Sequence, residues 1–159
     1  MKFNSALKNF VLVLFSTLLI SACSTAKKAA VDTVDDVYTG TDTVEYLANG
    51  VPDRDFFATN KSSLTTRSRD TLRKQATYLR KNKDLTVTIE GHADERGTRE
   101  YNLALGERRA NAAKDYLMTY GVSGKRISVI SYGKEKPVNP ASSPLAWSQN
   151  RRSVTIKAN

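Results

Sequence analysis

Apolar and polar side chains alternate in several short segments of the C-terminal two thirds of the chain. In one of them Leu85, Val87 and Ile89 fall on one face of an extended chain, with polar residues between them, which predicts a half-buried strand. Three further segments, one aromatic and two of mixed apolar and polar residues, indicate strands as well. The predicted strands are residues 55–59, 85–91, 127–133 and 153–157.

Two longer segments between these strands carry apolar residues at helical spacing. Leu72 and Leu79 recur on one face of residues 64–82, and hydroxyl side chains just before them can cap a helix. A second helix is predicted for residues 100–120, because Gly121 after it suits the left-handed position that ends many helices. Strands that alternate with helices predict an α/β layer fold.

The remaining C-terminal pattern predicts one small domain, residues 51–159. This length is enough for a modest core, and no internal repeat suggests a second domain. Between the last two strands lie Pro137, Pro140 and Pro144, which predict an irregular connecting loop. The order of the strands in the sheet does not follow from the pattern.

The N-terminus has the pattern of an export signal. Lys2 and Lys8 precede an apolar run, residues 10–20, which is too short to span a bilayer as a helix of about 20 residues. Small residues follow, and then Cys23, the single cysteine of the chain. The sequence Ile-Ser-Ala-Cys looks like a lipobox, so we predict a signal peptide over residues 1–22 and lipidation of Cys23.

Charge is distributed unevenly along the chain. Residues 24–60 carry three basic and seven acidic side chains, whereas residues 61–159 carry twenty basic and nine acidic ones. The acidic, Ala- and Thr-rich segment 23–50 is predicted as the lipidated N-terminus and a flexible tether. A basic domain favours polyanionic partners. An exported protein rarely meets nucleic acid, so the anionic polymer expected as partner is peptidoglycan, with its free stem-peptide carboxylates.

The candidate binding chemistry lies at the predicted strand-to-helix junction, residues 91–110. Asp94 stands in a glycine-bounded loop, and Arg109 follows in the helix. Such a pair can form a zwitterion receptor, with the carboxylate taking an ammonium and the guanidinium taking a carboxylate. At about 100° per residue, an apolar helix face that includes Leu103 and Leu117 places Arg108 in solvent and Arg109 at the rim of the buried face.

The sequences HADERGT (92–98) and LGERRAN (105–111) resemble the signature of the outer-membrane-protein-A-like peptidoglycan-binding domain. This resemblance implies a mixed four-stranded sheet with helices packed on one face, a βαβαββ-type α+β sandwich. It also implies a function in binding rather than catalysis, without a cofactor or metal. Its implied ligand is the meso-diaminopimelate of peptidoglycan stem peptides, bound by Asp94 and Arg109, with Thr98 and Asn102 at the border of the ligand.

The resemblance further implies a place in the cell envelope. A lipidated Cys23 followed by Ser24 fits the outer membrane, with the domain in the periplasm. The implied role is to tether the outer membrane to the wall as part of the Tol–Pal system of envelope integrity and cell division. A TolB-like periplasmic β-propeller protein is the implied protein partner.

Other polar residues receive simpler interpretations. His92 is read as a residue that orders the loop, because one His and one Cys make no metal cluster. Glu95, Arg96 and Arg99 are read as solvated loop charges, and Arg151 with Arg152 as a closing NRR motif whose role is structural. Nothing in the sequence holds two carboxylates across a cleft as a glycosidase needs.

The first strand departs from the family pattern. Asp55 stands where an apolar residue is expected, while Ala58, Asn60 and Ser63 replace acidic ones. Ligand contacts from this side are therefore not predicted. Two alternative functions stay open at this point: an envelope enzyme that acts on peptidoglycan, and another wall-anchoring protein that uses the same kind of domain.

Overall fold

The computed structural model describes residues 36–158, which lie in one compact unit of the chain, residues 33–159. The predicted signal peptide, the lipidation site at Cys23 and the first part of the predicted tether lie outside the described residues. Within the described part, no helix is long and apolar enough to cross a membrane.

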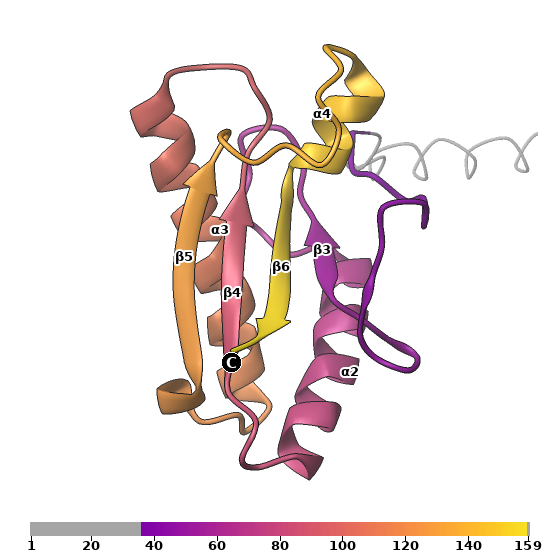
Figure 1. Ribbon diagram of the computed structural model, residues 1–159, viewed down its shortest axis with the longest axis vertical. Coiled ribbons are helices and arrows are strands. Elements are labelled where there is room, and N and C mark those ends of the chain that lie inside the picture. Colours follow the sequence, from indigo (N-terminus) through magenta and orange to yellow (C-terminus); the bar gives the residue numbers. More distant parts are fainter. Residues whose placement is uncertain (1–35, 159) are drawn as a thin grey trace, which may run out of the picture. The chain divides into compact units, whose positions relative to one another are not determined.

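A four-stranded mixed sheet organises the domain (Figure 1). Its order is β3-β6-β4-β5, where β6 pairs antiparallel with both β3 and β4, and β5 pairs parallel with β4. The strands are β3 (Arg54–Phe56), β4 (Val87–His92), β5 (Ile127–Gly133) and β6 (Arg152–Lys157). The mixed sheet confirms the predicted fold class.

Both long helices pack on the same face of the sheet, α2 (Thr66–Lys81) and α3 (Arg99–Thr119) (Figure 1). Thr65 and Thr98 cap their first turns by accepting hydrogen bonds from the backbone N–H three residues on. After α3, Gly121 has φ 83° and donates to the Met118 carbonyl at 2.9 Å, as the glycine prediction requires. The predicted helices are confirmed, with ends displaced by a few residues.

The core lies between these two helices and the sheet. It consists of aliphatic residues from α2, α3, β4 and the start of β5: Leu72, Ala76, Leu79, Val87, Ile89, Ala110, Ala113, Leu117, Val122 and Ile127. Leu103, which the helical spacing of apolar residues predicts to be buried, is 40% exposed, and Leu105 is buried instead. The buried face of α3 is therefore rotated toward Arg109.

Part of the predicted tether belongs to the folded unit. Tyr38 and Leu47 are buried, and the ring of Tyr38 contacts Phe56 edge-on at a centroid distance of 4.8 Å. A small hairpin of β1 (Tyr46–Ala48) and β2 (Val51–Pro52) completes this segment. The predicted domain boundary at residue 50 is thus too late. Apolar side chains in residues 36–50 pack against the domain and become buried there.

Two further elements differ from the predictions. The first strand ends at Phe56 instead of residue 59, because the chain turns at Asn60, whose φ is 56°. The proline-rich connection contains a helix, α4 (Pro144–Asn150), with Ser143 as its N-cap. A proline at the first helical position favours a helix start, since its fixed φ suits the helix and its missing N–H would be unpaired there anyway.

Asp55 is an unusual core residue, and its replacement by valine should stabilise the domain. It is 2% exposed, and neither carboxylate oxygen has a hydrogen-bond partner among the described residues. Burial, reinforced by the negative charge of Asp53, raises the pKa of Asp55 well above 3.8. Removing an unsatisfied buried polar group stabilises by about 1–3 kcal/mol, so Asp55→Val should unfold at a higher denaturant concentration.

The stability gain from Asp55→Val should depend on pH. Because the folded pKa of Asp55 is raised, the wild type loses further stability relative to Asp55→Val as pH rises from the unfolded pKa of about 3.9 towards the folded pKa, and this loss is constant above the folded pKa. Urea unfolding of both proteins at pH 4.5 and pH 8 measures this difference, and contributions from other groups cancel. A stability gap that stays constant between the two pH values would contradict this account of Asp55.

Candidate functional site

The candidate site forms where β4 ends and the chain crosses to α3. At this point Gly91 packs directly on the backbone of Gly106, and a Cβ atom at Gly91 would lie 1.8 Å from the Gly106 carbonyl oxygen. This close approach packs the first half of α3 against the end of β4. Ala93 N–H donates to the Gly133 carbonyl at 2.8 Å, which attaches the following loop to β5. These two contacts fix the backbone that precedes Asp94.

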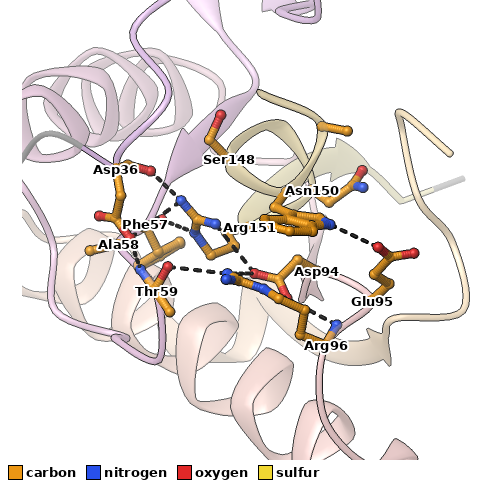
Figure 2. A network of polar contacts seen from close by, with 12 residues as sticks. Asp36, Phe57, Ala58, Thr59, Asp94, Glu95, Arg96, Ser148, Asn150 and Arg151 are labelled. Carbon is orange, nitrogen blue, oxygen red and sulfur yellow. Dashed lines mark hydrogen bonds and ion pairs between the residues drawn. The ribbon is translucent and has the colours of Figure 1, made fainter. Parts of the chain in front are cut away.

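The Asp94 carboxylate is held by two arginines (Figure 2). Its Oδ2 lies 2.7 Å from Arg96 Nη2 and 3.3 Å from Arg151 Nη1, and its Oδ1 accepts from the backbone N–H and Nε of Arg96, each at 3.1 Å. Burial alone would raise the pKa of Asp94, but the hydrogen bonds and charge of Arg96 outweigh it and hold this pKa below its usual value. Asp94 is consequently an anion at neutral pH.

Arg109 lies deeper than the sequence predicts, with no exposed surface. Its guanidinium donates to three backbone carbonyls, from Nη1 to His92 at 2.8 Å, from Nε to Lys61 at 2.9 Å and from Nη2 to Ala58 at 3.1 Å. Burial, with the nearby positive charge of Arg151, lowers the pKa of Arg109 to about 10, so it stays charged at neutral pH. The rim position predicted for Arg109 is wrong.

Asp94 and Arg109 lie close enough for the charge of Asp94 to act on Arg109, but the ion pairs of Asp94 are with Arg96 and Arg151. The position of Arg109 follows from the true buried face of α3, which contains polar and small residues such as Asn102 and Gly106 and which an apolar pattern cannot reveal. Arg108 is exposed, as predicted, with its guanidinium 5.9 Å from the ring centroid of Tyr101. Arg109 connects the β4 end to the 58–61 turn.

Arg151 is a functional candidate that the sequence interpretation left as structural. It is buried, and besides Asp94 it donates from Nε to the Phe57 carbonyl at 3.0 Å. Its Nη2 donates to the Asp36 backbone carbonyl and lies 3.5 Å from the Asp36 carboxylate. The NRR motif marks Arg151 in the sequence. The contact between Arg151 and Asp94 forms only because β6 pairs with β4 in the folded sheet.

A pocket of about 380 Å³ opens beside this network. Trp147 forms part of its wall, and the Arg96 guanidinium lies 4.4 Å from the Trp147 ring centroid. Trp147 Nε1–H donates to Glu95 at 2.8 Å, and with Ser142 this hydrogen bond lowers the pKa of Glu95. The lining residues are Asp36, Val37, Thr59, Arg96, Pro144, Leu145, Trp147, Ser148 and Arg151.

Thr98 and Asn102 support the loop from beneath. The Thr98 hydroxyl accepts the Tyr101 N–H at 3.2 Å as the cap of α3. Asn102 is buried and donates from Nδ2 to the Arg96 carbonyl at 2.8 Å. Both residues thus hold the loop that carries Asp94 and Arg96, and neither lines the pocket beside the network.

His92 is buried at the end of β4 and stacks on Tyr132 at a centroid distance of 5.6 Å. Burial, followed by the positive charges of Arg152 and Lys136, lowers the pKa of His92 to about 3, so its ring is neutral at neutral pH. Its carbonyl accepts from Arg109, which fits the predicted role of ordering the loop. Residues 36–158 contain no group of three or more His, Cys, Asp or Glu side chains that could hold a metal ion.

Fold and site together define a binding domain in which an ionised carboxylate and buried arginines meet at a strand-to-helix junction. Residues 56–151 match the model of the OmpA family. The chain therefore belongs to the OmpA family.

Relatives in this family are named as peptidoglycan-associated lipoproteins. The protein of Rhizobium meliloti (strain 1021) is 57% identical over 106 residues, which cover 67% of this chain and 60% of that protein. The matched stretch is thus about three fifths of the Rhizobium protein. The Brucella melitensis biotype 1 protein is 42% identical over 151 residues, with 91% of this chain and 89% of that protein covered.

Solved structures share the fold. The crystal structure of the peptidoglycan-associated lipoprotein from Burkholderia pseudomallei has a TM-score of 0.65 and 36% identity, and covers 67% of this chain and 90% of that chain. The C-terminal domain of Helicobacter pylori MotB, at 21% identity and a TM-score of 0.63, covers 67% of this chain and 84% of that chain. The MotB likeness shows the fold alone.

Proposed function

We propose that this protein binds peptidoglycan without covalent attachment, through the meso-diaminopimelate of stem peptides, and tethers the outer membrane to the wall. The observation that carries this proposal is the ionised Asp94, held between Arg96 and Arg151, the two arginines that line the adjacent pocket of about 380 Å³. The names of the Rhizobium, Brucella and Burkholderia relatives support the choice of polymer.

The ligand ammonium goes to Asp94 in this proposal. Arg96 is the partner that can be exchanged, because its side chain is 42% exposed while that of Arg151 is 3% exposed. When an ammonium replaces the Arg96 guanidinium, Asp94 keeps its contact with Arg151. The exchange conserves the charge balance of the buried carboxylate, so the domain gives up little stability on binding.

The carboxylate on the same carbon of diaminopimelate goes to Arg151 and Arg109. Arg151 lines the pocket directly. Arg109 takes part when the 58–61 turn releases the Ala58 carbonyl, the longest of its three hydrogen bonds. Thr98 and Asn102 keep the loop in position during this exchange. The site binds and does not cleave, and it needs no cofactor.

A lipid anchor at Cys23 completes the proposed tether. An outer-membrane location with the domain in the periplasm then follows, with a TolB-like β-propeller protein as partner in the Tol–Pal system. A single site with partly exposed ion pairs binds modestly, and many lipid-held copies facing one polymer provide the retention.

Intact-mass spectrometry of the membrane fraction should show a diacylglyceryl-sized mass increment on the wild-type chain that Cys23→Ser lacks. A wild-type chain without this increment would refute the lipid anchor.

Co-sedimentation of the purified protein with isolated sacculi tests the proposed function. The protein should pellet with sacculi and be released by an excess of diaminopimelate-containing muropeptides. Release of soluble muropeptides from the sacculi during incubation would instead indicate an enzyme. Failure to pellet at low ionic strength, where charge contacts are strongest, would overturn the proposal.

A further inference from the structure

Asp36 places a carboxylate of the protein itself inside the site (Figure 2). It belongs to the N-terminal segment, far from the β4–α3 junction in sequence. Its Oδ2 accepts the Thr59 backbone N–H at 2.6 Å and lies 3.5 Å from Arg151 Nη2. The same guanidinium contacts Asp94 on its other side, through Nη1 at 3.3 Å.

The groups around the Asp36 carboxylate form an anion subsite. A backbone N–H and a buried guanidinium are the donors that carboxylates prefer, and their charge-assisted hydrogen bonds are the stronger kind. Burial alone would raise the pKa of Asp36, but the hydrogen bonds from Thr59 and the charge of Arg151 lower it. The subsite therefore already contains an anion at neutral pH.

We propose that Asp36 is an internal ligand that occupies the place of a stem-peptide carboxylate between Thr59 and Arg151 and must leave before that carboxylate binds. This inference rests on the proposed function. Two features make the exchange feasible: the Asp36 side chain is 41% exposed, and it lines the same pocket as Arg96 and Trp147. Because Asp36 precedes the buried Tyr38 in the chain, a load applied at Cys23 would act on Asp36 before it acts on the packed residues that follow.

The expected consequence is a measurable increase in affinity when Asp36 is removed. The apparent affinity of a site falls in proportion to the fraction of molecules in which it is free. If the subsite is free in about one molecule in ten, Asp36→Ala should bind about tenfold more tightly than wild type. A purely structural role for Asp36 would predict unchanged or weaker binding.

Calorimetric titration of the full chain, purified in detergent, with a disaccharide tetrapeptide that contains meso-diaminopimelate provides the test. Asp36→Ala should gain about tenfold in affinity. Asp36→Asn, which keeps an oxygen for the Thr59 N–H but loses the charge, should gain less. Glu45→Gln is the matched control: it removes one negative charge from the same segment at a side chain that is 82% exposed, and should bind as wild type.

Equal affinity of Asp36→Ala and wild type, or weaker binding by the variant, would overturn the inference. Absence of binding by every protein would instead refute the proposed function, on which the inference depends. Nuclear magnetic resonance gives a second measurement: the Thr59 amide shift should follow the titration of Asp36 in the free protein and cease to do so at saturation. A Thr59 amide that still follows this titration in the complex would contradict displacement.

Discussion

Replacing Arg109 by alanine should destabilise the domain strongly and also abolish sacculus binding. The change removes three hydrogen bonds and leaves the carbonyls of Ala58, Lys61 and His92 without their donor. A carbonyl left without a partner costs about 1–3 kcal/mol when it is fully buried. Because the hydrogen bond to His92 is buried and those to Lys61 and Ala58 are only partly buried, a total loss of about 3–5 kcal/mol is expected. For a domain of this size, Tm should fall by roughly 10–20 °C. Thermal unfolding followed by circular dichroism measures this shift.

Two neighbouring substitutions separate the structural role of Arg109 from its charge. Arg108→Ala changes an exposed side chain one position earlier and should alter stability by no more than about 0.5 kcal/mol. Arg109→Lys keeps the charge but cannot span three carbonyls with a planar fork, so it should recover only part of the loss. If Arg109→Ala unfolded at the wild-type temperature, Arg109 would serve the ligand alone and the buried geometry would be irrelevant to stability.

Replacing Asp94 by asparagine should have its main effect on binding. The shape of the side chain is retained while its charge is lost, so a ligand ammonium loses a charge-assisted hydrogen bond worth about 1.5–3 kcal/mol. Binding to sacculi should weaken by about 10- to 100-fold. Arg96 can turn to solvent and Arg151 keeps Phe57 and Asp36 as partners, so the loss of stability should stay near 1–2 kcal/mol. Co-sedimentation at matched salt and a thermal unfolding curve report the two quantities.

The control for Asp94→Asn is the same substitution at Asp70. This residue lies on α2, its side chain is 56% exposed, and it pairs with Arg73 three residues later. Asp70→Asn changes the net charge equally and should pellet with sacculi as wild type does. Equal weakening by both substitutions would mean that overall charge, rather than a site at Asp94, governs retention on the wall.

The architecture was predictable because its signals are local. Alternation located the strands within a few residues, and the bounds predicted for β5 agree with the structure. Helix caps and Gly121 likewise depend on neighbouring residues only. The first strand is shorter than predicted because its end depends on the turn at Asn60, and α4 was missed because the density of prolines suggested an irregular loop although Pro144 begins a helix.

Burial at the site was not predictable from the apolar pattern. If Leu103 were a core residue, as the apolar pattern predicts, Arg109 would lie at the rim of the buried face, but Leu103 is 40% exposed. In the structure Arg109 is buried because three carbonyls from distant segments pair with it, and such pairing has no signature in apolar periodicity. The contacts of Arg151 with Asp94 and Asp36 join residues 57 and 115 positions apart, so only the folded chain shows them.

The most direct measurement compares muropeptides that differ at the third residue of the stem peptide. Diaminopimelate carries an ammonium and a carboxylate at its side-chain end, whereas lysine carries the ammonium alone. With a lysine-type muropeptide the arginines beside Asp94 gain no anion from the ligand, at a cost of about 1–3 kcal/mol. In calorimetric titrations of the wild-type chain in one buffer, the lysine-type muropeptide should bind about 10- to 100-fold more weakly. Equal affinity for both would contradict a site that recognises the two charges of diaminopimelate.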